Sequence, residues 1–464
     1  MSEQRIPLEQ ALFEVRRKIQ PRSVSGWFAT WRWSTVWATQ AVFYGLPWLE
    51  WNGRPAVLFD LVARKFYVLG FVFWPQDFIY LALMLITSAL ALFLFTAVAG
   101  RLWCGYACPQ TVYTEIFLWI EARIEGDRVA RLRLDGAALS ARKVLLRGGK
   151  HAAWMVVALW TGFTFVGYFT PIRALGAEAL AFALEPWEAF WVLFYAAATY
   201  GNAGWMREQV CKYMCPYARF QGAMFDRDTL IIGYDAVRGE PRGAHPRGVD
   251  ARTRGQGDCV DCSLCVQVCP TGIDIRQGLQ YECIGCAACI DACDQVMDKV
   301  GSPRGLIRYS TENALAQRTP LTGIARRMAR PRTIIYAAIL GLVVAAAGAS
   351  LALRVPLKVD VIRDRGMLVR EVGQGALENV YRLQVMNATE APHRYHIVAE
   401  GVPGMSVASD EFFDLDAAAT RAVAVRLQAP RGNLRDGSHP IHIFVQSLED
   451  ASIEVNEKST FLVH

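Results

Sequence analysis

Long apolar runs separated by basic segments recur along the chain up to residue 353. Each run is close to the roughly 20 residues that an α-helix needs to cross the hydrocarbon core of a bilayer. Tryptophans, which settle at membrane interfaces, stand at both ends of the first run. The pattern predicts five membrane-spanning helices, at about residues 31–51, 77–100, 152–169, 187–206 and 333–353.

The basic residues between these runs give an expected orientation. Arginine and lysine gather in the first 30 residues, between the second and third runs, and just before the fifth run. Because loops rich in these residues stay in the cytoplasm, we expect the N-terminus inside and the tail in the periplasm. The polar, basic first 26 residues contain no apolar core, so no cleavable signal peptide is expected. The short apolar stretch at 66–74 is expected to lie re-entrant or along the interface.

The chain changes character after residue 354. Stretches in which apolar and polar residues alternate are separated by Gly, Pro, Asn and Asp at intervals of about ten residues. Alternation with a period of two is typical of half-buried strands. The tail of roughly 110 residues is long enough for one domain, and we predict a small antiparallel β-sandwich.

Composition agrees with a membrane protein. The 464 residues are 53% hydrophobic, and the mean hydropathy is positive. The formal charge of +6 comes with arginine blocks that flank apolar runs, so positive-inside topology explains it better than nucleic-acid binding does. Membrane lipid is the expected surrounding, and no nucleic-acid partner is expected.

These patterns divide the chain into six expected segments. They are a cytoplasmic N-terminal segment (1–30), a membrane domain with four spans (31–206), a cytoplasmic linker (207–257), a cysteine-rich domain (258–310), a basic segment with the fifth span (311–353), and the periplasmic sandwich (354–464).

Eight of the twelve cysteines lie in two successive runs of the form C-x-x-C-x-x-C-x-x-x-C. In two-cluster ferredoxins three cysteines of one run bind one [4Fe-4S] cube and the fourth binds the other cube. The spacing therefore predicts a bacterial ferredoxin-like domain with two cubanes. The expected ligands are Cys259, Cys262, Cys265 and Cys293 for the first cluster, and Cys269, Cys283, Cys286 and Cys289 for the second.

Two other uses of these cysteines fit less well. Zinc sites also use C-x-x-C pairs, but two successive four-cysteine runs are not their usual spacing. Disulfides are disfavoured because the segment is expected in reducing cytoplasm.

A second cysteine pattern, C-x-x-x-C-P, occurs twice. Cys104 and Cys108 follow the second apolar run, and Cys211 and Cys215 follow the fourth, so both pairs are expected at the same cytoplasmic membrane edge. In a helix, cysteines at i and i+4 share one face, and the proline then bends or restarts the helix. Converging thiolates favour a soft metal such as Cu(I) or a redox-active dithiol. The residues leave metal, disulfide, a third cluster and simple packing open.

The whole chain resembles the CcoG family, also called FixG or RdxA. The resemblance is carried by PRSVSGW, CGYACPQT, CKYMCPYARFQ and CPTGIDIRQGLQYECIGC, in that order, followed by a last apolar run and a β-rich tail. It implies an immunoglobulin-like tail outside and an inner-membrane accessory factor for assembly of a cbb-type haem-copper oxidase. The implied reaction is reduction of Cu(II) to Cu(I), which would make the chain a cupric oxidoreductase.

The resemblance also implies partners: oxidase subunits and copper chaperones or a copper transporter. The electron donor is unidentified. A direct NAD(P)H site is not expected, because no G-x-G-x-x-G dinucleotide fingerprint opens a strand-helix unit. Two rival functions remain, a quinol-linked polyferredoxin subunit of an anaerobic respiratory pathway and a structural chaperone of the oxidase. The sequence leaves open whether the chain is a monomer or a homodimer.

Overall fold

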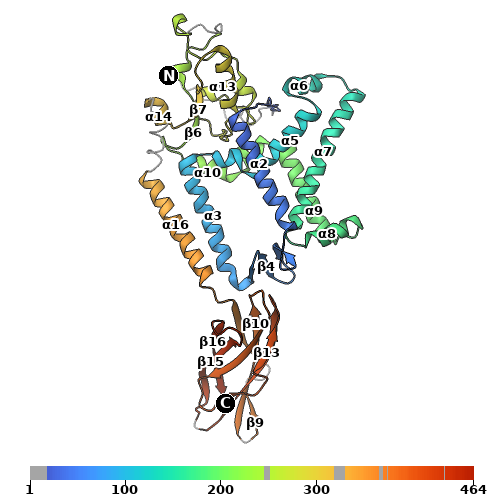
Figure 1. Ribbon diagram of the computed structural model, residues 1–464, viewed down its shortest axis with the longest axis vertical. Coiled ribbons are helices and arrows are strands. Elements are labelled where there is room, and N and C mark those ends of the chain that lie inside the picture. Colours follow the sequence, from blue (N-terminus) through green and yellow to red (C-terminus); the bar gives the residue numbers. More distant parts are fainter. Residues whose placement is uncertain (1–17, 245–250, 318–329, 365–368, 374, 433) are drawn as a thin grey trace, which may run out of the picture. The chain divides into compact units, whose positions relative to one another are not determined.

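The computed structural model describes residues 18–244, 251–317, 330–364, 369–373, 375–432 and 434–464 (Figure 1). The first 17 residues and the basic segment 318–329, which contribute to the expected topology, lie outside these ranges, as does part of the expected linker. The chain forms two compact units. Unit 1 comprises Met1–Gly45, Leu85–Gly167 and Leu175–Gly341, and unit 2 comprises Leu46–Met84, Tyr168–Ala174 and Leu342–His464.

Unit 1 is mainly helical. Its purely helical part contains α2 (Trp27–Gly45), α4 (Leu102–Tyr106), α5 (Pro109–Ile124), α6 (Arg128–Gly136), α7 (Ala141–Val166), α9 (Pro186–Thr199), the π-helices η3 (Tyr200–Met206) and η4 (Val210–Met214), and α10 (Pro216–Met224). Its cysteine-rich part contains β6 (Ile231–Tyr234), α11 (Ala236–Gly239), η5 (Ala251–Arg254), α12 (Leu264–Gln267), η6 (Ile275–Gln277), α13 (Ala288–Val300), β7 (Ile307–Ser310) and α14 (Glu312–Gln317). Three further helices, α3 (Phe78–Ala99), α8 (Ile172–Leu180) and α16 (Pro331–Ala352), have residues in both units.

Among the described residues, two helices are long and apolar enough to cross a membrane. They are Pro75–Ala99, with a mean hydropathy of 2.5, and Pro331–Ala352, with a mean hydropathy of 2.3. The other three predicted runs are also helical, but with different bounds. Helix α2 ends at Gly45, six residues before the predicted end, because Pro47 cannot donate a backbone hydrogen bond and Leu46–Trp48 form a 3-10 turn, η1. Helix α7 begins at Ala141, where the Ser140 side chain caps it.

The apolar stretch at 66–74 consists mostly of β-strand. It forms β4 (Lys65–Val68) and β5 (Phe71–Phe73), which extend an antiparallel sheet begun by β3 (Val57–Asp60). Phe66 lies between Phe59 and Phe73 in register, and such aromatic cross-strand pairs stabilise sheets. A smaller hairpin, β1 (Glu50–Trp51) with β2 (Arg54–Pro55), precedes this sheet.

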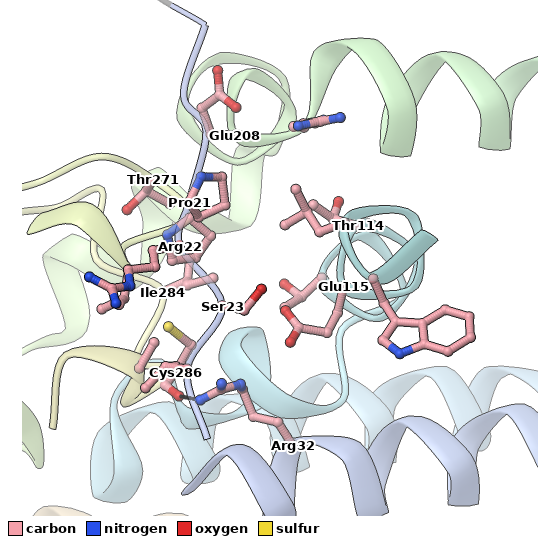
Figure 2. Close-up of a pocket in the computed structure, with 18 of the residues that line it drawn as sticks. Pro21, Arg22, Ser23, Arg32, Thr114, Glu115, Glu208, Thr271, Ile284 and Cys286 are labelled. Carbon is pink, nitrogen blue, oxygen red and sulfur yellow. Dashed lines mark hydrogen bonds between the residues drawn. The ribbon is translucent and has the colours of Figure 1, made fainter. Parts of the chain in front are cut away.

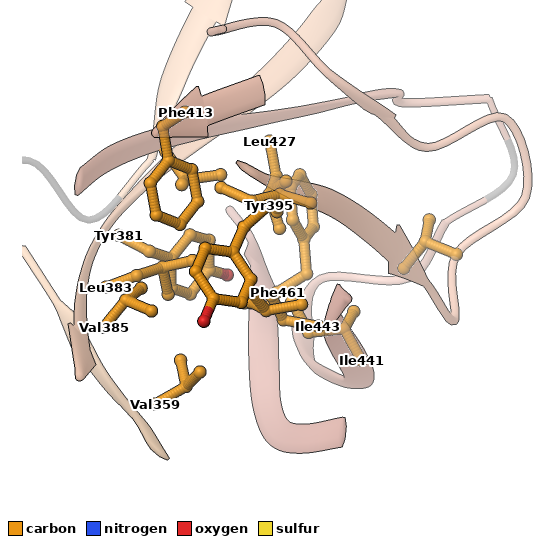
Figure 3. Close-up of a cluster of buried hydrophobic side chains, with 14 of the residues drawn as sticks. Val359, Tyr381, Leu383, Val385, Tyr395, Phe413, Leu427, Ile441, Ile443 and Phe461 are labelled. Atoms are coloured by element: carbon orange, nitrogen blue, oxygen red, sulfur yellow. The ribbon is translucent and has the colours of Figure 1, made fainter. Parts of the chain in front are cut away.

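The C-terminal part of unit 2 is an antiparallel sandwich of two sheets, as predicted. One sheet has the strand order β12–β14–β10–β8, with β9 also paired to β10, and the other has the order β13–β11–β15–β16. Side chains from both sheets meet in one core, where Tyr381, Tyr395 and Phe461 are fully buried (Figure 3). The strands are β8 (Leu357–Arg363), β9 (Arg370–Val372), β10 (Ala376–Asn387), β11 (His393–Glu400), β12 (Ser406–Val407), β13 (Phe412–Leu415), β14 (Thr420–Pro430), β15 (Gly437–Ser447) and β16 (Glu454–Val463).

A buried carboxylate joins three parts of unit 2. Asp77, just before α3, accepts hydrogen bonds from the Trp74 backbone (3.1 Å) and from Arg354 (2.7 Å), which follows α16. It also pairs with Lys358 on β8. Arg354 lies over the Phe73 ring, 5.0 Å from its centroid. The charge pairs therefore hold the start of one apolar helix, the end of another and the first strand of the sandwich in one arrangement.

We predict that Asp77→Ala lowers the free energy of unfolding of the full chain by about 3–5 kcal/mol, because it leaves two cations without their buried partner. The unfolding temperature of the detergent-solubilised chain measures this. Asp436→Ala is the control, since Asp436 is exposed and pairs with Arg431 at the surface, where such pairs contribute at most about 1 kcal/mol. Equal effects of the two substitutions would show that the buried pairs do not stabilise the unit.

Candidate functional site

The two cysteine runs share a local backbone pattern between strands β6 and β7. In each run the residues on both sides of the second cysteine have positive φ: Asp261 (53°) and Ser263 (57°) around Cys262, and Gly285 (70°) and Ala287 (60°) around Cys286. Residues other than glycine rarely adopt this backbone conformation. It is typical of functional loops that the surrounding structure holds in place. The repeat turns successive cysteines of each run toward a common point, and the helices α12 and α13 begin directly after these turns.

The eight cysteines line two small cavities. Cys259, Cys262, Cys265 and Cys293 line one cavity, and Cys269, Cys283, Cys286 and Cys289 line the other, which Cys265 also reaches. These are the two sets that the spacing predicts, including the exchange of the last cysteine of each run. Most of the remaining walls are apolar, with residues such as Val296 and Ile275. Four thiols in an apolar enclosure fit a [4Fe-4S] cubane, because a cubane requires one thiolate for each iron.

Burial keeps the metal-free thiols protonated. It raises the pKa of Cys286 to about 12, with a further contribution from the charge of Cys269. It raises the pKa of Cys293 to about 12 as well, and the neighbouring Cys265 adds to this shift. Thiolates are the iron ligands, so the thiol protons must leave when iron binds.

Two arginines that sequence reasoning missed hold the second cysteine run. Arg32 on α2 donates to the Cys286 carbonyl (2.6 Å), and Arg101 donates to the Cys283 carbonyl (3.3 Å) and to the carbonyls of Tyr281 and Ala218. Both side chains are buried. Their signal in the sequence is a charge inside or at the edge of an apolar run, which is typical of functional positions in membrane proteins.

Asp291 is a third residue that the sequence did not single out. It lies on α13, and its carboxylate accepts hydrogen bonds from the backbone N–H groups of Phe28 (3.2 Å) and Ala29 (2.7 Å) at the start of α2. A carboxylate at this position satisfies free N–H groups and complements the helix dipole. It therefore fixes the cysteine-rich domain to α2.

The second pair of motifs has a different local structure from the predicted single helix. Cys104 lies on α4, but that helix ends at Tyr106, and Cys108 is the N-cap of α5 with Pro109 at its first position. Cys211 lies on η4, and Cys215 is the N-cap of α10, followed by Pro216. The two cysteines of a pair are therefore not on one helix face. The prolines restart the chain as a new helix, since proline is well tolerated at the first helical position.

The structure brings the four thiols of these motifs, here called the thiol tetrad, into one neighbourhood. Burial raises the pKa of Cys211 to about 12, and the charges of Cys108, Cys104 and Cys215 raise it further. Burial likewise raises the pKa of Cys104 to about 11, and its sulfur lies 3.4 Å from the amide nitrogen of Gln221. Within the described ranges, no three Cys, His, Asp or Glu side chains are arranged to hold a single metal ion.

The thiol tetrad and the second cysteine run are in direct backbone contact. A Cβ atom on Gly105 would lie 2.8 Å from the Cα atom of Cys286, and one on Gly285 would lie 3.1 Å from the carbonyl carbon of Arg101. Real Cβ atoms do not approach this closely, so only glycine fits at Gly105. The residue next to Cys104 therefore packs on a residue expected to bind the second cluster.

A polar cavity of about 160 Å³ reaches the same place (Figure 2). It lies between the N-terminal segment at residues 21–24 and α5, and Cys286 and Cys211 both line it. Figure 2 shows Ser23 and Glu115 facing each other across it, with Arg32 bonded to the Cys286 carbonyl below. One cysteine of each kind of site therefore lines this cavity.

Three known proteins are similar in sequence over most of the chain. Protein RdxA of Cereibacter sphaeroides is 39% identical over 438 residues, which cover 92% of each chain. The nitrogen fixation protein FixG of Rhizobium meliloti is 38% identical, over 85% of this chain and 82% of that protein. Protein RdxB of Cereibacter sphaeroides is 40% identical, over 83% of each chain. The chain belongs to the CcoG/FixG/RdxA family.

Family models match the separate parts. A 4Fe-4S dicluster domain matches residues 206–312, which include the two cysteine runs. A 4Fe-4S binding domain matches residues 81–126, which include the first pair of the thiol tetrad. The model of the IG-like fold at the C-terminal of FixG matches residues 347–464. The chain is thus an iron-sulfur protein with redox activity and an immunoglobulin-like C-terminal domain.

We predict that Gly105→Ala reduces iron binding by up to about four irons per chain, the content of one cubane. The added methyl group would displace the Gly285–Cys286 backbone, which carries one expected ligand. Iron and sulfide analysis of the purified chain measures the loss. Gly136→Ala is the matched control, because a Cβ there meets no described atom within 4 Å. Full iron content in both variants would contradict the proposed role of this contact.

Proposed function

We propose that this iron-sulfur electron-transfer protein reduces Cu(II) to Cu(I) for the copper centre of a cbb-type haem-copper oxidase. The observation that carries the proposal is the contact of Gly105 with Cys286, which puts a soft thiol site beside an expected cluster ligand. The proposed partners are oxidase subunits, copper chaperones or a copper transporter, and an electron donor of unidentified chemistry.

The two kinds of cysteine site would divide the work. When bound, a cubane supplies single electrons at low potential, and the conversion of Cu(II) to Cu(I) consumes one electron. The thiol tetrad would take the ion, because thiolate is a soft ligand that favours Cu(I) over Cu(II). Both sites can thus act on one copper ion without a mobile carrier between them.

The protein's own residues would prepare both sites. Arg32 and Arg101 fix the backbone carbonyls of the second run, so the position of Cys286 relative to α4 does not depend on side-chain packing alone. Because burial raises the pKa of Cys104 and Cys211, metal binding would release protons at this site. Copper binding is therefore expected to weaken as the pH falls.

We propose that four further features describe the chain in the cell. It is a bacterial inner-membrane protein with five spans, its N-terminus and cysteine sites are cytoplasmic, and its C-terminal domain is periplasmic. The arginine distribution and the need for reducing surroundings at the free cysteines support this orientation.

Reporter fusions test the orientation. We expect a cytoplasmic signal from a fusion near Gly257 and a periplasmic signal from a fusion after Lys358, because the apolar helix Pro331–Ala352 separates the two points. Expression of each fusion is checked by immunoblot. The same signal from both positions would mean that this helix does not cross the membrane.

Replacement of the thiol tetrad tests the chemistry. We predict that a variant with Ser at Cys104, Cys108, Cys211 and Cys215, pre-reduced, converts Cu(II) to Cu(I) at least about tenfold more slowly than the wild type. A factor of ten corresponds to a barrier change of about 1.4 kcal/mol, a modest loss for the removal of all soft ligands. The measurement is single-turnover Cu(I) formation followed with a chromogenic chelator.

The iron and sulfide content of the same variant is the control. If that content is unchanged and the rate still equals the wild-type rate, copper is reduced elsewhere and the proposed role of the tetrad is wrong. If copper binding is also unchanged, the four thiols serve packing alone.

A further inference from the structure

Unit 1 contains a cavity of about 400 Å³ that copper chemistry does not use. Liquid water occupies about 30 Å³ per molecule, so this space is large enough for a group the size of a phosphate with its hydration. It lies between the N-terminal segment, α5, α7 and η3. Its lining consists of Lys18, Ile19, Glu121, Arg147, Lys150, His151, Trp154, Gly204, Trp205, Arg207 and Glu208.

Cationic side chains outnumber carboxylates in this lining. Four cationic side chains, Lys18, Arg147, Lys150 and Arg207, face two carboxylates, Glu121 and Glu208. Outside the lining, Glu125 pairs with Lys150 (3.1 Å) and with Arg147 (3.4 Å), and Asp135 at the rim also pairs with Arg147. Arg131 also forms an ion pair with Glu121, with 2.9 Å between its Nη1 atom and the carboxylate Oε2 atom. The group as a whole keeps an excess of positive charge.

Arg207 has one hydrogen-bond donor without an acceptor among the described residues. Its side chain is 6% exposed, its Nε atom donates to the Gly204 carbonyl (2.9 Å), and its Nη2 atom pairs with Glu121 (2.7 Å). Its Nη1 atom is buried and has no hydrogen-bond acceptor among the described residues. A buried donor without an acceptor costs free energy, which a bound anion would recover.

The backbone at Arg207 is strained in a way that favours a functional role. Its φ is +43°, and it directly follows the π-helix η3. Both features are uncommon and are typical of binding or catalytic sites. The strain places the guanidinium group against Trp154, with its central carbon 5.5 Å from the ring centroid. The same turn leads to Cys211.

The pKa values of two groups in the lining are lowered, chiefly by burial. Burial lowers the pKa of Lys18 to about 8, and the charges of Lys150, Arg147 and Arg207 lower it further, against the opposing effect of Glu121. Burial also lowers the pKa of His151, with Lys150 and Arg147 acting in the same direction and Glu125 and Glu121 opposing them.

We infer that this cavity binds a phosphate group, carried by a soluble phosphate ester or by the headgroup of an anionic phospholipid. The free Nη1 atom of Arg207 can donate to one phosphate oxygen, and Lys18, Arg147 and Lys150 line the same cavity. Cations from three different parts of the chain can contact several oxygens of a tetrahedral anion. This site goes beyond the proposed copper chemistry and does not depend on it.

The test uses the full-length chain, delipidated in detergent and free of phosphate. Binding of inorganic phosphate is measured by calorimetry against sodium chloride of equal ionic strength. In a second arm, the chain is exposed to vesicles of phosphatidylglycerol or phosphatidylcholine and the retained lipid is measured by native mass spectrometry. We expect saturable binding of phosphate, of phosphatidylglycerol in preference to phosphatidylcholine, or of both. The arm that binds more tightly identifies the source.

Variants locate the site. Arg207→Gln is expected to abolish the binding. Because Arg207 is buried, Lys18→Gln is the second variant: its side chain is 48% exposed, so the fold should survive, and binding should weaken by at least about tenfold, as loss of one charged contact implies. Arg133→Gln, an exposed residue of α6 outside the lining, is the control and should bind like the wild type. No saturable binding in either arm, or equal effects of Lys18→Gln and Arg133→Gln, would overturn the inference.

Discussion

The close packing of α4 on the second cysteine run is the constraint on which the rest of unit 1 depends. Gly105 can approach Cys286 only because it has no side chain. That approach puts Cys104 beside a residue expected to bind the second cluster, and it requires the cluster loop to keep one conformation. The hydrogen bonds from Arg32 and Arg101 to carbonyls of that loop meet this requirement, and Asp291 holds the start of α2 against the same domain.

The buried arginines also have an electrostatic reason to lie where they do. An isolated guanidinium in an apolar interior is expensive, yet Arg32 and Arg101 are almost fully buried. Their donors meet carbonyl oxygens of the loop. Four thiolates around a cubane add negative charge at the same place, and opposite charges in a poorly hydrated interior attract strongly. Hydrogen bonding and charge neutralisation thus favour the same positions, so these residues can stabilise the loop and lie near the redox site at once.

Sequence patterns predicted most of what depends on local periodicity. Alternation along residues 354–464 predicted the sandwich, and the cysteine spacing predicted the two sets that line separate cavities. Contacts between distant residues had no local signal: Arg32 and Cys286 are 254 positions apart. The strands within 66–74 had no such signal, because a short apolar run alone does not distinguish a strand from other buried segments. Likewise, i and i+4 spacing implied one helix for each thiol pair, but the capped helix starts at Cys108 and Cys215 interrupt it.

The strained turn at Arg207 is shared by two cavities of unit 1. Arg207 and Glu208 line both the larger cavity and the smaller one that reaches Cys211 and Cys286. A ligand that favours one backbone conformation of this turn also favours one position of Cys211, four residues further along the chain. Coupling of this kind is reciprocal. Each ligand shifts the equilibrium between two conformations of the shared segment only by the difference between its affinities for those conformations. An anion that strengthens metal binding at the tetrad must therefore itself bind more tightly to the metal-loaded chain.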